Sequence, residues 1–244
     1  MTAASGAAAL LDLFLPRTCV HCEAPTGAGI LCAPCWSRLP VLAAPRCERC
    51  GHPNRGRACT YCPSLPPFVR SVRSVCWVPD PVSSAAVEAL KYDGWTGIAA
   101  PMADRIARLA WPVDVLDERA AVVPVPLANT RRRERGYNQA ELLADEIGTR
   151  WGIPCWADVI TRDRNTPTQT RLTPSERSTN VHRAFRVNEA ARGVRQRIAG
   201  AHIVLVDDVL TTGATLNAAA TELFHAGARI ISYVTFGRAR TAAD

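Results

Sequence analysis

Two adjacent acids and a threonine-rich loop stand in residues 204–215 of this 244-residue sequence. The apolar run that ends at Asp207 and Asp208 is typical of a buried strand, and a helix is expected after the loop. Loop amides and hydroxyls at a helix N-terminus form an anion site, and Gly213 lets the backbone approach a phosphate closely. Carboxylates cannot bind a phosphate, but they accept hydrogen bonds from a diol. The stretch therefore predicts a site for a ribose 5-phosphate.

A plain turn is the alternative for the same residues. In that interpretation Asp207 and a threonine only cap the helix that follows. It leaves the second acid and two further hydroxyls without a role at the end of a strand, so we favour the ligand site.

Eight of the ten cysteines fall into four Cys-x-x-Cys pairs in the first quarter of the chain. Such a turn points two thiolates at one metal, and two turns complete a tetrahedral zinc site. Four turns therefore predict two structural zinc ions. Chain order suggests that the first two pairs share one ion and the last two the other, although the sequence also leaves an interleaved pairing open. The pairs are Cys19/Cys22, Cys32/Cys35, Cys47/Cys50 and Cys59/Cys62.

Paired cysteines also serve other chemistry. A disulfide framework needs an oxidising compartment, whereas the N-terminus lacks the basic region and cleavage site of an export signal. A redox motif stands singly at the start of a helix, and an iron–sulfur cluster also takes cysteine ligands. The repeated paired spacing favours zinc. The isolated Cys76 and Cys155 are expected in the core.

The chain changes character near residue 67. Residues 1–67 are expected to form a short helix at 7–15 and a double zinc-ribbon module held together by metal. Residues 68–244 alternate strand and helix patterns, which predicts a parallel sheet with helices on both faces and a ligand at the carboxyl ends of its strands. Strands are expected at 69–78, 120–125, 156–160, 182–187, 203–207 and 229–236, and helices at 98–110, 138–149, 214–226 and from Ser83 or Ser84 through Tyr92.

Several motifs together resemble a known family. Residues 204–215 resemble the signature of type I phosphoribosyltransferases. Leu-Lys-Tyr-Asp-Gly at 90–94, Val-Pro-Val-Pro-Leu at 123–127 and Arg-Arg-Arg-Glu-Arg-Gly-Tyr-Asn-Gln-Ala at 131–140 follow the paired cysteines. With Arg162, Thr166, Gln169, Arg177, Asn180 and Phe185, they resemble the ComF family of competence-associated proteins over nearly the whole chain. The resemblance implies a type I phosphoribosyltransferase-like α/β fold behind a zinc-ribbon module.

The resemblance also implies a ligand, 5-phosphoribosyl-1-pyrophosphate. The paired acids, which are the expected catalytic residues, would hold the ribose hydroxyls, and the loop would hold the 5-phosphate. Mg²⁺ would bind the pyrophosphate and the ribose hydroxyls while keeping most of its waters. The residues so assigned are Asp207, Asp208, Val209, Leu210, Thr211, Thr212, Gly213, Ala214 and Thr215.

Cations for the pyrophosphate are expected after the strand at 120–125, where the resemblance places a pyrophosphate loop. Guanidinium groups fork onto phosphate oxygens. Candidates are Arg131, Arg132, Arg133 and Arg135, and Lys91 is a further one. The alternatives are a solvated helix start or a nucleic-acid contact for the arginines, and an interaction with a helix dipole for Lys91.

The polar, aperiodic segment 161–180 is expected to be a lid. A lid that closes over the site would exclude water from a reactive sugar cation, and the resemblance implies the same role. Its candidate ligand contacts are Arg162, Gln169 and Arg177.

The formal net charge of +7 suits phosphate groups or nucleic acid, and it is also typical of a solvated surface. The absence of an export signal or of an apolar segment of transmembrane length predicts a cytoplasmic protein without membrane insertion. The resemblance implies that it binds the donor with Mg²⁺ and that it could transfer phosphoribose to an unknown nitrogen nucleophile. By resemblance it is linked to DNA uptake and the competence machinery.

The alternative is a non-catalytic protein that binds single-stranded DNA and uses the fold as a ligand sensor. Trp36, Trp95 and Trp111 could serve that role, although core packing is expected for two of the three.

Overall fold

The computed structural model describes residues 17–27, 29–54, 59, 61–92, 94–162 and 184–240. The helix expected at 7–15 and most of the expected lid lie outside the described residues. None of the helices in the described ranges is long and apolar enough to cross a membrane.

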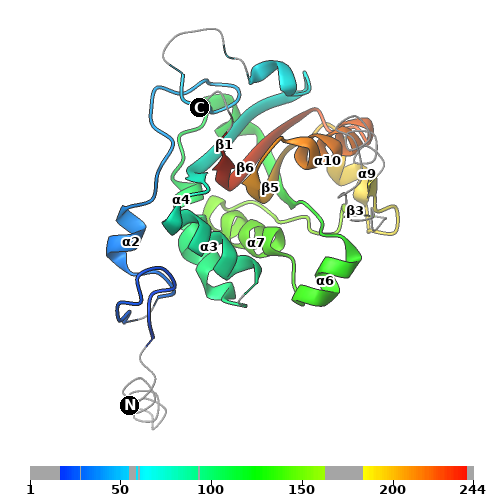
Figure 1. Ribbon diagram of the computed structural model, residues 1–244. Coiled ribbons are helices and arrows are strands. Elements are labelled where there is room, and N and C mark those ends of the chain that lie inside the picture. The colour runs from blue at the N-terminus through cyan, green and yellow to red at the C-terminus, as the bar shows by residue number, and fades with distance from the viewer. Residues whose placement is uncertain are drawn as a thin grey trace, which may run out of the picture.

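A four-stranded parallel sheet forms the centre of the molecule (Figure 1). Its order is β1 (Val69–Val78), β6 (Ile230–Ala239), β5 (His202–Leu210) and β2 (Arg119–Pro124), and all three pairings are parallel. The inner strands β5 and β6 are almost wholly buried, as strands covered on both faces must be. The predicted parallel sheet is confirmed.

Helices cover both faces of this sheet. They are α3 (Pro81–Lys91), α4 (Ala99–Ala107), α5 (Val113–Glu118), α7 (Gln139–Trp151), α9 (Val194–Ile198) and α10 (Ala214–His225), whereas α6 (Asn129–Arg135) buries none of its residues. α3, α4 and α7 share one core with Val204 and Val206 of β5. α9 and α10 share the other core with Ile203 and Leu205. Alternate residues of one strand thus serve the two faces.

The strand that carries the two acids is longer than predicted. β5 continues through both acids to Leu210, because β6 offers pairing partners as far as Arg238. The acids therefore lie in the last part of a strand, not after it. The expected strand pieces at 156–160 and 182–187 correspond to a separate antiparallel pair, β3 (Ile160–Arg162) and β4 (Phe185–Val187).

Helix boundaries also differ from expectation. α3 starts at Pro81 because the Asp80 carboxylate accepts a hydrogen bond from Val82 N (3.0 Å), and proline suits the first turn. Ser83 is buried and donates instead to the Trp77 carbonyl (2.7 Å). α4 ends at Ala107, three residues early. The arginine-rich stretch expected as a loop is helix α6.

The N-terminal module, with the short helices α2 (Ala33–Ser37) and η1 (Cys62–Ser64), lies along the β1 edge of the sheet (Figure 1). Trp77 N donates to Pro40 O (2.9 Å) and Leu42 N donates to Val75 O (3.1 Å). These bonds form an antiparallel bridge that pairs part of the outer edge of β1.

Candidate functional site

The two acids of β5 lie in a charged environment. The Lys91 ammonium at the end of α3 is 2.6 Å from the Asp208 carboxylate, which is almost fully buried. Asp208 N donates to Asp207 Oδ1 (2.8 Å), and Val209 N donates to Asp208 Oδ1 (2.9 Å). Burial and the neighbouring Asp208 hold the pKa of Asp207 well above its usual range, and Lys91 opposes this shift. The pair thus concentrates negative charge that a cation or a hydrogen-bond donor would relieve.

Lys91 is the only lysine in the sequence, since each of the other Lys or Arg residues is an arginine. An ammonium is a compact charge on a flexible stem, whereas a guanidinium is a planar fork. The end of α3 that carries Lys91 is fixed by Tyr137, whose hydroxyl donates to the Leu90 carbonyl (2.6 Å). The ion pair therefore joins the end of α3 to a central strand, and Tyr137 joins the same helix end to the turn before residue 139.

The motif at 135–139 builds the turn that holds Tyr137 there. Gly136 adopts a left-handed conformation (φ 80°) and ends α6. Asn138 is buried, caps α7 by accepting from Ala140 N (3.1 Å), and donates to Val125 O at the end of β2 (3.1 Å). Arg135 donates to the buried Gln139 side chain. The sequence contained these signals, a glycine followed by a capping asparagine, but their positioning role was not predicted.

A cavity of about 280 Å³ opens beside Lys91. It is lined by Lys91, Tyr92, Gly94, Arg131, Glu134, Arg135 and Tyr137. Arg131 and Arg135 are four residues apart and so share one face of α6. Arg133 does not line the cavity, and Arg132 pairs with Glu141 (3.2 Å). The structure thus brings three of the predicted cations together and leaves the other two outside.

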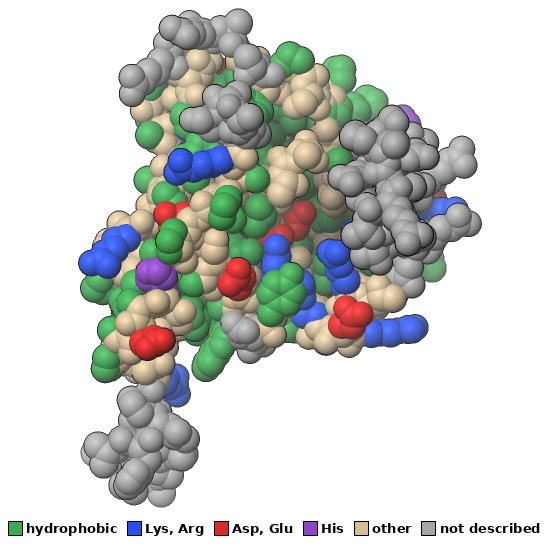
Figure 2. All heavy atoms as spheres, in the orientation of Figure 1, with side chains coloured by type: hydrophobic (Ala, Val, Ile, Leu, Met, Phe, Trp, Pro, Cys, Tyr) green, Lys and Arg blue, Asp and Glu red, His purple; other side chains and the backbone are tan. Residues whose placement is uncertain are grey.

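Arg162 approaches the acids from β3. Its guanidinium lies 5.3 Å from the centre of the Phe185 ring, and its buried Nε has no hydrogen-bond partner among the described residues. Burial and the charge of Arg131 lower the pKa of Arg162, while Asp207 opposes this. Arg162, Arg131 and Asp207 therefore share one electrostatic neighbourhood. Figure 2 shows Lys and Arg side chains gathered around acidic ones near the middle of this face. Gln169 and Arg177 lie outside the described residues.

The threonine-rich loop connects β5 to α10. Thr211 and Thr212 are exposed, and Gly213 adopts a left-handed conformation (φ 80°) at the N-cap of α10. Thr212 Oγ1 accepts from Ala214 N (3.4 Å). Val209 and Leu210 belong to the strand, and Ala214 and Thr215 form the first turn of the helix. The loop therefore leaves hydroxyls and helix amides at the carboxyl end of β5.

The eight paired cysteines form two groups of four. The first two pairs along the chain make one group and the last two make the other, which is the predicted pairing and not the interleaved one. In each group the ligand atoms lie within 4.8 Å of one another. The Sγ–Sγ separations are 3.6 Å for Cys22/Cys32, 3.4 Å for Cys47/Cys62 and 3.2 Å for Cys50/Cys59. Four sulfurs about 2.3 Å from a zinc stand roughly 3.8 Å apart, so both groups fit a closed zinc site. None of these cysteines forms a disulfide, and neither does Cys76 or Cys155.

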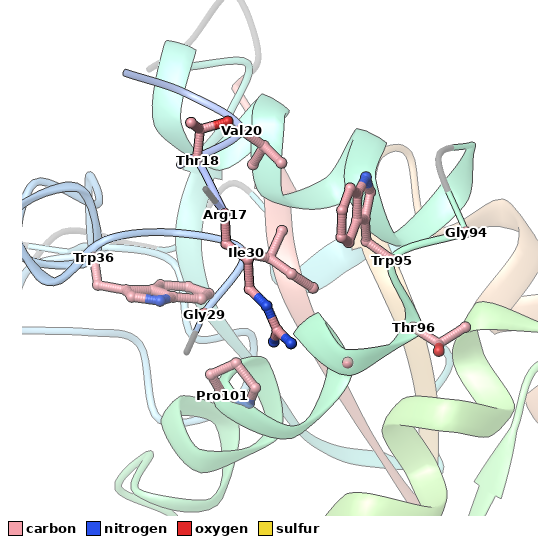
Figure 3. A pocket seen from close by; sticks show the side chains of 11 residues that line it. Arg17, Thr18, Val20, Gly29, Ile30, Trp36, Gly94, Trp95, Thr96 and Pro101 are labelled. Carbon is pink, nitrogen blue, oxygen red and sulfur yellow. The ribbon is translucent and has the colours of Figure 1, made fainter. Parts of the chain in front are cut away.

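The three tryptophans differ in exposure. Trp111 is buried, Trp36 is partly buried under the Arg105 guanidinium (3.8 Å), and Trp95 is 51% exposed. Trp36 and Trp95 lie on opposite sides of a cavity of about 970 Å³ between the first cysteine group and α4, with Ile30 and Arg17 between them (Figure 3). Two of the three tryptophans are thus packed, as expected.

Comparisons with known proteins agree with this architecture. The double zinc ribbon domain family matches residues 10–65, and the phosphoribosyl transferase domain family matches residues 99–244. DNA utilization protein YhgH of Salmonella typhimurium is 31% identical over 90% of this chain and 96% of its own. Competence protein F of Haemophilus influenzae is 29% identical over 84% and 89% of the two chains, and competence protein ComFC of Bacillus subtilis 29% over 81% and 79%. The chain belongs to the ComF family of competence-associated proteins, which joins a double zinc ribbon to a phosphoribosyltransferase-type domain.

Proposed function

We propose that this chain binds 5-phosphoribosyl-1-pyrophosphate together with Mg²⁺ at the carboxyl ends of β5 and β2. The observation that carries the proposal is the ion pair between Lys91 and Asp208 beside a cavity lined by Arg131 and Arg135. Two carboxylates that can accept hydrogen bonds from a diol thus lie next to cations that can bind a pyrophosphate. A threonine loop at a helix N-terminus, which suits a monoester phosphate, follows on the same strand.

Each group has a separate task in this proposal. Asp207 and Asp208 accept hydrogen bonds from the ribose hydroxyls, and Thr211, Thr212 and the α10 amides hold the 5-phosphate. Lys91, Arg131, Arg135 and Arg162 face the pyrophosphate. Mg²⁺ would supply further positive charge to the pyrophosphate, and Asp207 and Asp208 could hold it through water.

We further propose that the site transfers phosphoribose. The C1–oxygen bond breaks, the pyrophosphate leaves with the electron pair, and a nitrogen lone pair forms the new bond to C1 and then loses a proton. The cations stabilise the leaving group as its charge develops, and no protein nucleophile is needed.

Calorimetry tests the binding proposal. The intact protein is titrated with the donor, with and without Mg²⁺, and with ribose 5-phosphate and pyrophosphate as part-ligands. We expect the donor to bind more tightly than either part, and to require Mg²⁺ for full affinity. Absence of donor binding at millimolar concentration with Mg²⁺ would overturn the proposal.

A second candidate function is the binding of single-stranded nucleic acid in the cavity of Figure 3. The half-exposed Trp95 offers a face on which a base can stack, and the names of the relatives refer to DNA utilization and competence. Fluorescence titration with an oligothymidylate should quench Trp95, and Trp95→Ala should abolish the quenching. Equal quenching in the variant would exclude this surface.

A further inference from the structure

The second cysteine group, Cys47, Cys50, Cys59 and Cys62, adjoins the threonine loop. Cys50, Tyr61 and Leu65 line one side of a narrow space of about 30 Å³, and residues 210–213 line the other. The space is about the volume of one water molecule, so the ribbon and the loop are nearly in contact. A shift of the ribbon backbone would therefore displace the residues of the loop.

Asn217 links the loop's helix directly to this ribbon. Its side-chain amide donates to the Ser64 carbonyl (3.1 Å), and its side-chain oxygen accepts from the buried Tyr233 hydroxyl (3.1 Å). Its backbone N–H donates to Gly213 O (2.8 Å), which belongs to the loop. One residue in the first turn of α10 thus contacts the ribbon, the sheet and the loop.

Arg238 makes a second link, from β6. Its side chain is buried, forms no ion pair among the described residues, and donates to the Cys50 carbonyl (2.6 Å). Its guanidinium lies 5.1 Å from the centre of the Tyr61 ring. A buried cation without a carboxylate is costly, but a zinc ion with four thiolates carries net negative charge. A zinc ion bound by the second cysteine group would therefore place negative charge on the side of the ribbon that Arg238 contacts.

Arg49 completes this arrangement on the ribbon side. It donates to the Cys62 carbonyl (3.4 Å) and to the Pro66 carbonyl (2.8 Å), just before the chain enters β1. Guanidinium groups thus bind carbonyls of two of the four metal-ligating cysteines. Polar contacts to backbone carbonyls next to the metal ligands thus hold the ribbon to the sheet.

We propose that the second zinc ribbon positions the phosphate loop, with Asn217 and Arg238 as the positioning residues. This inference rests on the proposed function only in naming the ligand that the loop holds. Zinc in the second site fixes the Cys50 and Ser64 carbonyls, these fix α10 through Asn217 and β6 through Arg238, and the loop between β5 and α10 takes its shape from both. The affinity for a 5-phosphate then depends on a metal that never touches it.

The first test measures loop order without any ligand. Hydrogen exchange is followed in the full-length protein over residues 210–220 and, as an internal reference, over α7. Asn217→Ala removes the contact to Ser64, and Tyr233→Phe is the matched control because it removes only the bond to the sheet. We expect exchange at 210–220 to become about fivefold faster in Asn217→Ala, as for loss of one hydrogen bond, and to stay unchanged in the control and over α7. Equal exchange in both variants would overturn the inference.

The second test separates the inference from the proposed function. Affinities for the donor, ribose 5-phosphate and pyrophosphate are measured for the same variants, with zinc content checked at two per chain. We expect Asn217→Ala to bind the donor and ribose 5-phosphate about tenfold more weakly and pyrophosphate with wild-type affinity. A uniform loss for all three ligands would show a general structural defect and would overturn the positioning role. Faster exchange in a protein that binds no donor would refute the proposed function and leave the positioning role intact.

Discussion

The first cysteine group is held to the molecule by apolar packing and the second by polar contacts. Cys19 and Cys35 belong to the core shared with α3 and α4, and Trp36 packs edge-on against Phe236 at 6.3 Å. The second group meets the sheet through Arg49 and Arg238, which donate to backbone carbonyls. Apolar contacts are non-directional, whereas hydrogen bonds need a defined geometry. Two metal centres with the same ligands can therefore differ in effect. Losing the second should disturb the geometry of the neighbouring sheet more than losing the first.

The largest expected difference comes from removing one ligand of each metal. We expect Cys32→Ser and Cys59→Ser each to lower the zinc content from two ions to one, because structural zinc contributes about 10 kcal/mol or more to the folding of such modules. Cys59→Ser should also weaken donor binding more than about tenfold, whereas Cys32→Ser should change it less than about twofold. Metal analysis and calorimetry on the two variants measure both effects. Equal loss of donor affinity in the two variants would contradict the inference that only the second ribbon positions the phosphate loop.

The paired acids allow a comparison between the cysteine variants, which act on the site from a distance, and residues proposed to contact the ligand directly. Changing Asp207 and Asp208 together to Asn should weaken donor binding about a hundredfold or more, because two charge-assisted hydrogen bonds are lost. Zinc content should stay at two per chain, unlike in the cysteine variants. If the acids only capped a helix, calorimetry would give wild-type affinity, since Asn caps as well as Asp.

The two faces of α6 allow a finer comparison. Arg131 lines the cavity beside Lys91, and Arg133 does not. We expect Arg131→Gln to weaken binding of the donor and of pyrophosphate about tenfold, as for one charge-assisted contact, and Arg133→Gln to have little effect. The two variants have the same net charge. A similar loss of affinity in both would therefore show a long-range effect of charge and not a direct contact of Arg131 with the pyrophosphate.

The smallest expected effect concerns stability and pH. The pKa of Asp207 is raised in the folded protein, so its ionised form destabilises the folded state above the unfolded pKa of about 3.9. This penalty grows as pH rises toward the folded pKa and is absent at lower pH. Asp207→Asn should therefore raise the Tm at pH 7, and the difference from wild type should shrink as the pH falls. A variant less stable than wild type at pH 7 would show that the Lys91 field outweighs burial.

The sequence predicted what short-range patterns determine. The cysteine spacing gave both metal groups, and the apolar runs gave the four strands of the sheet and the helices α3, α4, α7 and α10. Helix α6 was missed because its arginines carry no apolar periodicity, and the extent of β5 depends on the pairing offered by β6.

Contacts between distant segments could not be predicted in the same way. Lys91 and Asp208 are more than a hundred residues apart, and only the order of strands and helices brings the end of α3 to the end of β5. The link from Asn217 to Ser64 joins residues 153 positions apart. Lys91 and Asp208 were each predicted from the sequence as site residues, but their pairing was not, and Asn217 was not predicted at all. The ion pair and the support of the loop become evident only in three dimensions.

The segment that joins the two ribbons has a consequence for self-association. Its bridge between Val41 and Cys76 occupies part of the outer edge of β1, and a bridge between Val122 and Cys155 does the same at β2. Open strand edges are templates for pairing with another chain. Because zinc centres hold both ends of the segment over β1, a chelator would uncover one edge of a parallel sheet. Loss of zinc is therefore expected to favour edge-to-edge association of this protein as well as to unfold its ribbons.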